Sequence, residues 1–191
     1  MPKPDDDSVG IRARTPAATQ AWKRTLEDMQ AIAEERRSEG WEMTTLPAIQ
    51  TSVLSKADGS EDRFGLIHVL ADNHADTFRT AYEKGSFPRS EAYRNTVDGF
   101  VYLVTELLDP DSETGILIAS QYDLHLARGM IASAIDEGKL QTRVKLIDGT
   151  ELAMTTHEDV SAFVPDLGHI KAQLGVEDEQ DEQDEQDEHE G

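Results

Sequence analysis

The stretch that decides the fold is FVYLVTELLDPDSETGILIASQY, residues 100–122. Two apolar runs, FVYLVTELL (100–108) and GILIASQY (115–122), flank the polar segment DPDSE (109–113), whose Asp, Pro and Ser residues are typical of a turn. This pattern predicts a β-hairpin. Because both runs are almost continuously apolar, we expect the hairpin to lie at the centre of a sheet.

The residues before this hairpin predict two helices and further strands. Pro16 at a first helical position and Gly40 at a C-cap bound an amphipathic helix. Its apolar stripe is Trp22, Leu26, Met29 and Ala33. A strand region at 41–54, which Pro47 interrupts, and a buried strand at 64–70 come next. They are followed by a helix that begins at Asn73 and ends at Gly85, and by an edge strand at 87–94.

The residues after the hairpin predict one more helix and a second hairpin. Asp123 is placed to cap a helix that ends at Gly138. Strands at 142–146 and 152–154 are joined by Asp148-Gly149, a strong hairpin signal, and a short helical turn covers 158–163. The order therefore predicts an α+β fold, a mainly antiparallel sheet with helices packed on it, in a single domain spanning 15–175.

The charge divides the chain into a body and a tail. The formal net charge is −21, and residues 177–191 hold ten carboxylates and no Lys or Arg. A tract without apolar residues whose charges repel one another predicts a disordered acidic tail at 176–191, and 1–14 is expected to be a flexible segment. The rest of the chain carries a net charge of −11 on an ordinary globular composition. A carboxylate-rich, lysine-poor surface is typical of proteins that stay soluble in high salt, so we expect a halophilic protein.

Composition and motifs exclude several classes of function. The chain has no cysteine, which rules out disulfides, thiolate metal sites and a cysteine nucleophile. Its acidity argues against nucleic-acid binding, and it lacks the glycine-rich phosphate loops, the hydrolase elbow and the HExxH zinc motif. The segment MPKPDDD does not resemble a secretory signal, and the longest apolar runs fall far short of the roughly 20 residues of a membrane span. We therefore expect a cytoplasmic protein that binds no membrane.

Two groups of polar residues are candidate sites. His68, Asp72 and His74 lie close together in the sequence and carry side chains that hold divalent metals, although a core histidine at 68 and a turn or capping residue at 72 explain the pattern more simply. Tyr122, Asp123, His125 and Arg128 follow the second central strand, where a helix N-terminus could bind an anion. For this second group the alternative is that Asp123 caps its own helix.

Three segments carry a resemblance to a known family. Residues 64–78 (FGLIHVLADNHADTF), 104–111 (VTELLDPD) and 117–122 (LIASQY) resemble an uncharacterised protein family of halophilic archaea. The resemblance runs from about Trp22 to Pro165 and leaves the tail outside. It implies a haloarchaeal cytoplasm and a domain of unknown function, and it implies no catalytic residues.

The sequence favours a binding role over catalysis. A well-patterned core without a recognisable catalytic set predicts a non-enzymatic binding or regulatory domain for a protein partner or a small ligand. The alternative is a metal-assisted enzyme that uses His68, Asp72 and His74, and a third possibility is that the acidic tail itself binds a basic partner. The cofactor and the oligomeric state are left open.

Overall fold

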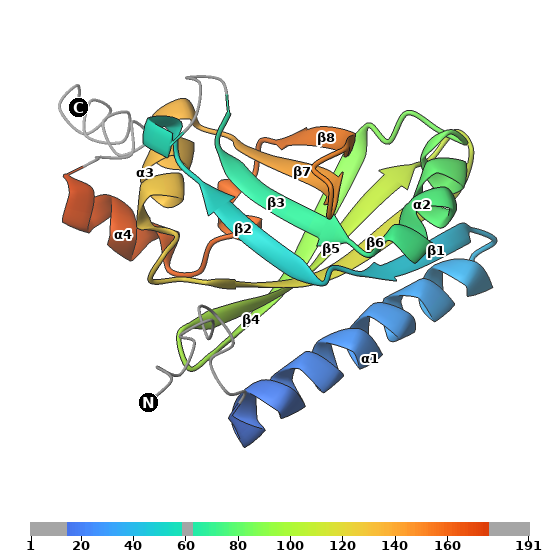
Figure 1. The fold of residues 1–191 in the computed structure, drawn as a ribbon, viewed down its shortest axis with the longest axis horizontal. Coiled ribbons are helices and arrows are strands. Elements are labelled where there is room, and N and C mark those ends of the chain that lie inside the picture. Colours follow the sequence, from blue (N-terminus) through green and yellow to red (C-terminus); the bar gives the residue numbers. More distant parts are fainter. Residues whose placement is uncertain (1–14, 59–62, 176–191) are drawn as a thin grey trace, which may run out of the picture.

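A computed structural model of the protein describes residues 15–58 and 63–175. Within these ranges the strands form two four-stranded sheets that pack face to face (Figure 1). Sheet I has the order β1 (Glu42–Pro47), β6 (Thr114–Asp123), β5 (Phe100–Asp109), β4 (Arg89–Val97), and sheet II the order β2 (Gln50–Leu54), β3 (Gly65–Leu70), β7 (Leu140–Leu146), β8 (Glu151–His157). The helices are α1 (Pro16–Ser38), α2 (Ala75–Tyr82), α3 (Arg128–Glu137) and α4 (Leu167–Leu174), with short 3-10 turns η1 (Lys56–Asp58), η2 (Asp72–His74) and η3 (Val160–Ala162).

The predicted α+β class is confirmed, and the central hairpin lies where the sequence placed it. Strands β5 and β6 pair antiparallel from Phe100 opposite Asp123 to Asp109 opposite Thr114, and they occupy the two inner positions of sheet I. Strand β4 lies at the edge of that sheet, as Pro88 and its charged residues predicted. Both sheets are mostly antiparallel.

The prediction of one sheet is corrected to two, because the chain changes sheets after Pro47. Strand β1 pairs parallel with β6, and the Ala48 amide still donates to the Ala119 carbonyl of sheet I. The next amide, that of Ile49, donates to the Val69 carbonyl of sheet II, where β2 pairs antiparallel with β3. A parallel pair, β3 with β7, also occurs in sheet II. The interruption at Pro47 therefore marks a corner between two sheets.

Helix α1 covers the outer face of sheet I (Figure 1). Met29 and Ala33 are fully buried against Val104, Leu117 and Ala119, while Trp22 and Leu26 pack at the margin of this cluster. The Thr15 hydroxyl accepts the Ala18 amide at the N-terminus, the cap that precedes Pro16 in the sequence. The predicted stripe is thus the contact face of α1.

Two apolar clusters fill the space between the sheets. The α2 cluster joins Phe78 of α2 to both sheets through residues such as Leu70, Leu107 and Ile118. The α3 cluster joins Ile131 of α3 to the other end of both sheets, through residues that include Leu66, Leu103 and Tyr122. Each helix therefore closes one end of the layer between the sheets.

The starts of two helices differ from prediction. The segment that begins at Asp72 opens as the 3-10 turn η2, so α2 starts at Ala75 and Asn73 does not cap it. Helix α3 starts at Arg128, because Asp123 ends β6 and its carboxylate accepts the His125 amide at 2.9 Å in a local turn. Short-range side-chain bonds compete with helix capping at such positions.

The predicted flexible segment 1–14 and the predicted acidic tail 176–191 lie outside the described residues. Among the helices of 15–58 and 63–175, none combines the length and the apolar character that crossing a bilayer requires.

Candidate functional site

The structure does not bring Tyr122, Asp123, His125 and Arg128 together as a ligand set. Tyr122 points into the α3 cluster, where it is 2% exposed and its hydroxyl donates to the Phe163 carbonyl at 2.6 Å. Burial raises the pKa of Tyr122. His125 and Arg128 lie on the surface, and α3 starts only at Arg128 instead of directly after Asp123.

The residues His68, Asp72 and His74 are placed in different environments. His68 lies in the middle of β3, is 1% exposed and has its Nδ1 atom 3.1 Å from the Thr51 hydroxyl. Asp72 and His74 belong to η2, and Asp72 is exposed at the surface. Within 15–58 and 63–175, no three His, Asp or Glu side chains are grouped in a way that could hold a metal ion.

A groove opens instead where the free edges of the two sheets meet. Strand β4 is the edge of sheet I and β8 the edge of sheet II, and the chain after β8 turns through η3 along the same side. The groove has a volume of about 720 Å³. It is lined by Pro88, Arg89, Ser90, Glu91, Ala92, Thr156, His157, Glu158, Asp159, Ala162 and Phe163. This volume is within the range of small-molecule sites, about 300–1,000 Å³.

A chain of hydrogen bonds ties the floor of the groove to the interior. The Ser90 hydroxyl lies 2.6 Å from His157 Nδ1, and His157 Nε2 lies 2.8 Å from the Thr142 hydroxyl. His157 is 3% exposed, and its ring packs on Phe163 at a centroid distance of 4.4 Å. Phe163 in turn accepts the Tyr122 hydroxyl through its carbonyl. Tyr122 therefore supports the wall of the groove from behind.

Burial keeps the imidazole of His157 uncharged. Desolvation lowers the pKa of His157 to about 4, so the ring is neutral at neutral pH and has one donor and one acceptor nitrogen. With Thr142 on one nitrogen and Ser90 on the other, both ring positions are occupied. Such a ring fixes the direction of the Ser90 hydroxyl, which is half-buried and faces the groove.

The lining of the groove is mostly polar and charged. Arg89 approaches Glu91 at 3.5 Å across the rim, and the Ser161 hydroxyl donates to Asp159 at 2.5 Å. The apolar part of the lining comes from Pro88, Ala92, Ala162 and Phe163. A small polar ligand with a limited apolar part matches this distribution.

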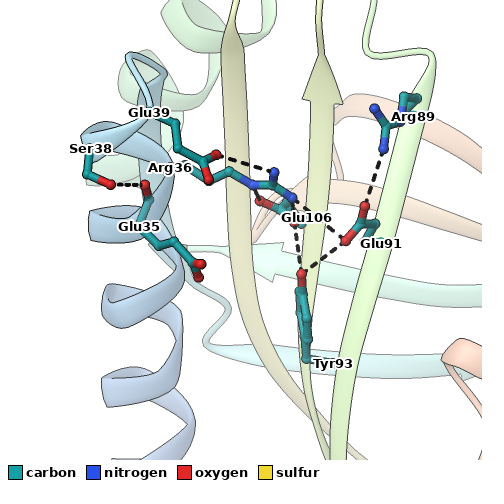
Figure 2. A network of polar contacts seen from close by, with 8 residues as sticks. All are labelled: Glu35, Arg36, Ser38, Glu39, Arg89, Glu91, Tyr93 and Glu106. Carbon is teal, nitrogen blue, oxygen red and sulfur yellow. Dashed lines mark hydrogen bonds and ion pairs between the residues drawn. The ribbon is translucent and has the colours of Figure 1, made fainter.

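A second polar cluster, on the opposite face of β4 and β5, connects α1 to sheet I (Figure 2). Glu106 of β5 is 0% exposed, and its carboxylate accepts two hydrogen bonds from Arg36 of α1, at 2.9 Å from Nε and 3.1 Å from the second terminal nitrogen. The Tyr93 hydroxyl lies 3.0 Å from Glu91 and 3.3 Å from Glu106. Hydrogen bonding to Glu106 raises the pKa of Arg36, and burial raises that of Tyr93.

This cluster has the properties of a structural clamp. The Arg36–Glu106 contact is bidentate, which is the strongest common geometry for a guanidinium and a carboxylate. Arg36 also lies 5.7 Å from the centroid of the Trp41 ring. Because both Glu106 oxygens are engaged by α1, we assign the pair to holding the helix on the sheet. The Glu91 carboxylate links the clamp to the rim of the groove.

Sequence reasoning did not identify the groove. Ser90 and His157 are 67 residues apart and lie on strands of different sheets, so neither composition nor local spacing connects them. No local pattern marks the pair, since Ser90 lies near the start of an edge strand and His157 follows Ala153 and Thr155 on the same face of β8. The pair can be recognised only when β4 and β8 are known to face each other.

These features define the class of protein: an α+β domain of two face-packed sheets, with a helix on one outer face and a groove between two free sheet edges. The chain belongs to the DUF7529 family, a family of unknown function whose pattern matches residues 10–165. The matched range includes every strand of both sheets and ends before α4. The prediction of an uncharacterised family is therefore confirmed. Comparisons with curated proteins and with solved structures find no match.

Proposed function

We propose that this protein is a non-enzymatic binding domain whose ligand occupies the groove between β4 and β8. The observation that carries the proposal is the groove itself, about 720 Å³ in volume, with a fixed hydroxyl on its floor and a lining that is mostly polar and charged. Small-molecule sites orient their ligands through a few convergent polar groups. The ligand class is a small polar molecule with a limited apolar part.

Binding fits the chemistry of the floor better than catalysis does. Ser90 and His157 are within hydrogen-bonding distance, but the pKa of His157 is about 4, which makes the ring a weak base at neutral pH. A serine nucleophile is activated by a base whose pKa lies near the working pH. The pair is therefore suited to orient a hydroxyl towards a ligand.

The cellular setting belongs to the same proposal. A net charge of −21 on a chain with 18 Lys and Arg supports a high-salt, haloarchaeal cytoplasm, where a dense carboxylate surface remains soluble. The same charge opposes contact with nucleic acid and with anionic membrane surfaces. A protein partner is the alternative occupant of the groove region.

A thermal-shift screen of small metabolites in molar KCl tests the proposal. A ligand at 100 times its Kd stabilises a protein by about 2.7 kcal/mol, which corresponds to a rise in Tm of about 5–11 °C for a chain of this size. The variant T156W places a large side chain at the rim, because Thr156 is exposed and lines the groove. Its matched control is T96W, since Thr96 is an exposed threonine of β4 that does not line the groove.

The expected result is a compound that raises the Tm of the wild-type protein and of T96W but not that of T156W. A compound that stabilises all three proteins equally binds elsewhere and contradicts the proposal. A complete screen without any stabilising compound also contradicts it.

A further inference from the structure

A polar layer crosses the core between the α2 cluster and the α3 cluster. On four strands a polar residue stands between one member of each cluster, with side chains on the same face: Leu66–His68–Leu70, Leu103–Thr105–Leu107, Ile118–Ser120–Tyr122 and Leu140–Thr142–Val144. Three further strands each add a polar residue that is hydrogen-bonded to this layer or paired with it in register. The complete layer consists of Thr51, His68, Ser90, Thr105, Ser120, Thr142 and His157.

One half of this layer is hydrogen-bonded and the other half is not. Ser90, His157 and Thr142 form the chain that starts at the groove, and Thr51 contacts His68 Nδ1. Three atoms of the layer are fully buried and have no hydrogen-bond partner in the described part of the chain: His68 Nε2, Thr105 Oγ1 and Ser120 Oγ. An unpaired buried polar group costs about 1–3 kcal/mol.

Strand register places the residues that carry these three atoms at one level of the core. Thr105 pairs with Ile118, so Ser120, two residues along β6, is its diagonal neighbour on the same face. Ser120 directly follows Ala119, whose carbonyl accepts the amide of Ala48, where the chain leaves sheet I on its way to β2. Strand β2 brings Thr51 opposite His68. His68 therefore lies in sheet II at the level that Thr105 and Ser120 occupy in sheet I.

The groove is next to this region. Ala92, which lines the groove, pairs with Thr105 across β4 and β5. Ser90 and His157 belong both to the layer and to the groove floor. The layer therefore extends inward from the groove, towards the three unpaired atoms.

We propose that the polar layer is an internal binding site for water, held by His68 Nε2, Thr105 Oγ1 and Ser120 Oγ. Buried water in proteins bridges two to four otherwise unpaired polar groups, and this layer contains three such groups. The neutral ring of His68 and two hydroxyls can both donate to and accept from a water molecule, whereas an ion would find no compensating charge in the layer. The bound water joins the two sheets at their centre.

A crystal structure of the full chain, at a resolution that shows ordered solvent, tests the proposal directly. We expect ordered water about 2.7–3.2 Å from the Thr105 and Ser120 hydroxyls. The second measurement is the Tm of T105V and S120A, which remove one hydroxyl each with little change in shape. If water occupies the layer, each variant loses a hydrogen bond and its Tm falls by about 1–6 °C.

A rise in the Tm of T105V and S120A overturns the proposal. Without bound water, each variant removes an unpaired buried hydroxyl, and its Tm rises. A layer free of ordered water in the crystal structure overturns the proposal equally. The matched control is T96V on exposed β4, for which we expect a change in Tm within about 2 °C.

Discussion

Neutralising Glu106 tests how α1 is held on sheet I. The Glu106 side chain is 0% exposed and accepts two hydrogen bonds from Arg36, which is itself 24% exposed. Removing one partner of a buried ion pair costs about 3–5 kcal/mol. We expect about 2–3 kcal/mol for E106Q, since the amide keeps an acceptor oxygen and Arg36 retains Glu91 at 3.7 Å.

Thermal unfolding followed by circular dichroism in molar KCl measures this effect. At about 2–4 °C per kcal/mol for a chain of this size, the Tm of E106Q should fall by about 4–12 °C. The control K23Q removes the exposed contact between Lys23 and Glu27, and its Tm should change by less than about 3 °C. The double variant R36M/E106L should recover most of the loss, because an apolar pair replaces a buried ion pair without leaving a lone charge. Equal Tm values for E106Q and K23Q would refute the clamp.

Three further predictions concern acid, salt and backbone geometry. Burial lowers the pKa of His68 and of His157 to about 4, against about 6.5 in the unfolded chain, so the unfolded state binds more protons between these values. The contribution of these histidines to the free energy of unfolding is therefore fully present above about pH 6.5, and it falls towards pH 4 by up to about 1.4 kcal/mol per pH unit for each histidine. Urea unfolding at several pH values measures this slope. An unchanged slope in H157N contradicts the lowered pKa of His157. Lowering KCl from molar to about 0.1 M should reduce the Tm, since the charges repel more strongly with less screening, and a constant Tm contradicts the high-salt proposal. In G65A the new Cβ would lie 1.8 Å from the Gln141 carbonyl oxygen at a φ of +127°, so we expect the free energy of unfolding to fall by more than about 3 kcal/mol, or no folded protein. The control G40A has nothing within 4 Å of its Cβ and should lower the free energy of unfolding by about 1–2 kcal/mol.

The sequence predicted those parts of the fold that depend on local pattern. The two apolar runs of the central hairpin determine β5 and β6, and the helix between Pro16 and Gly40 follows from its caps and its stripe. The apolar period of a helix and a turn between two apolar runs are short-range properties, which explains why they can be seen in one sequence. The edge position of β4 was predictable for the same reason, through Pro88.

The arrangement in space depended on contacts that the sequence does not encode locally. Pro47 was visible as an interruption, but its role as a corner between two sheets depends on the Ala48 and Ile49 amides bonding to different sheets. The polar layer was hidden because Thr105 and Ser120 each interrupt an apolar run only once. Their common level appears after the strands are aligned in register. The groove could not be predicted from the sequence, because it forms between edge strands of two different sheets whose relative position must be known first.

The most direct test of the groove as the ligand site is chemical-shift mapping of a stabilising compound on the full chain. If the account is correct, titration shifts the amide resonances of Ser90, Ala92, Thr156 and His157, the residues that line the groove. A second hollow of about 360 Å³, lined in part by Thr77 and Thr80 of α2, provides the internal comparison. Shifts confined to that hollow, or spread evenly over the surface, would contradict the account.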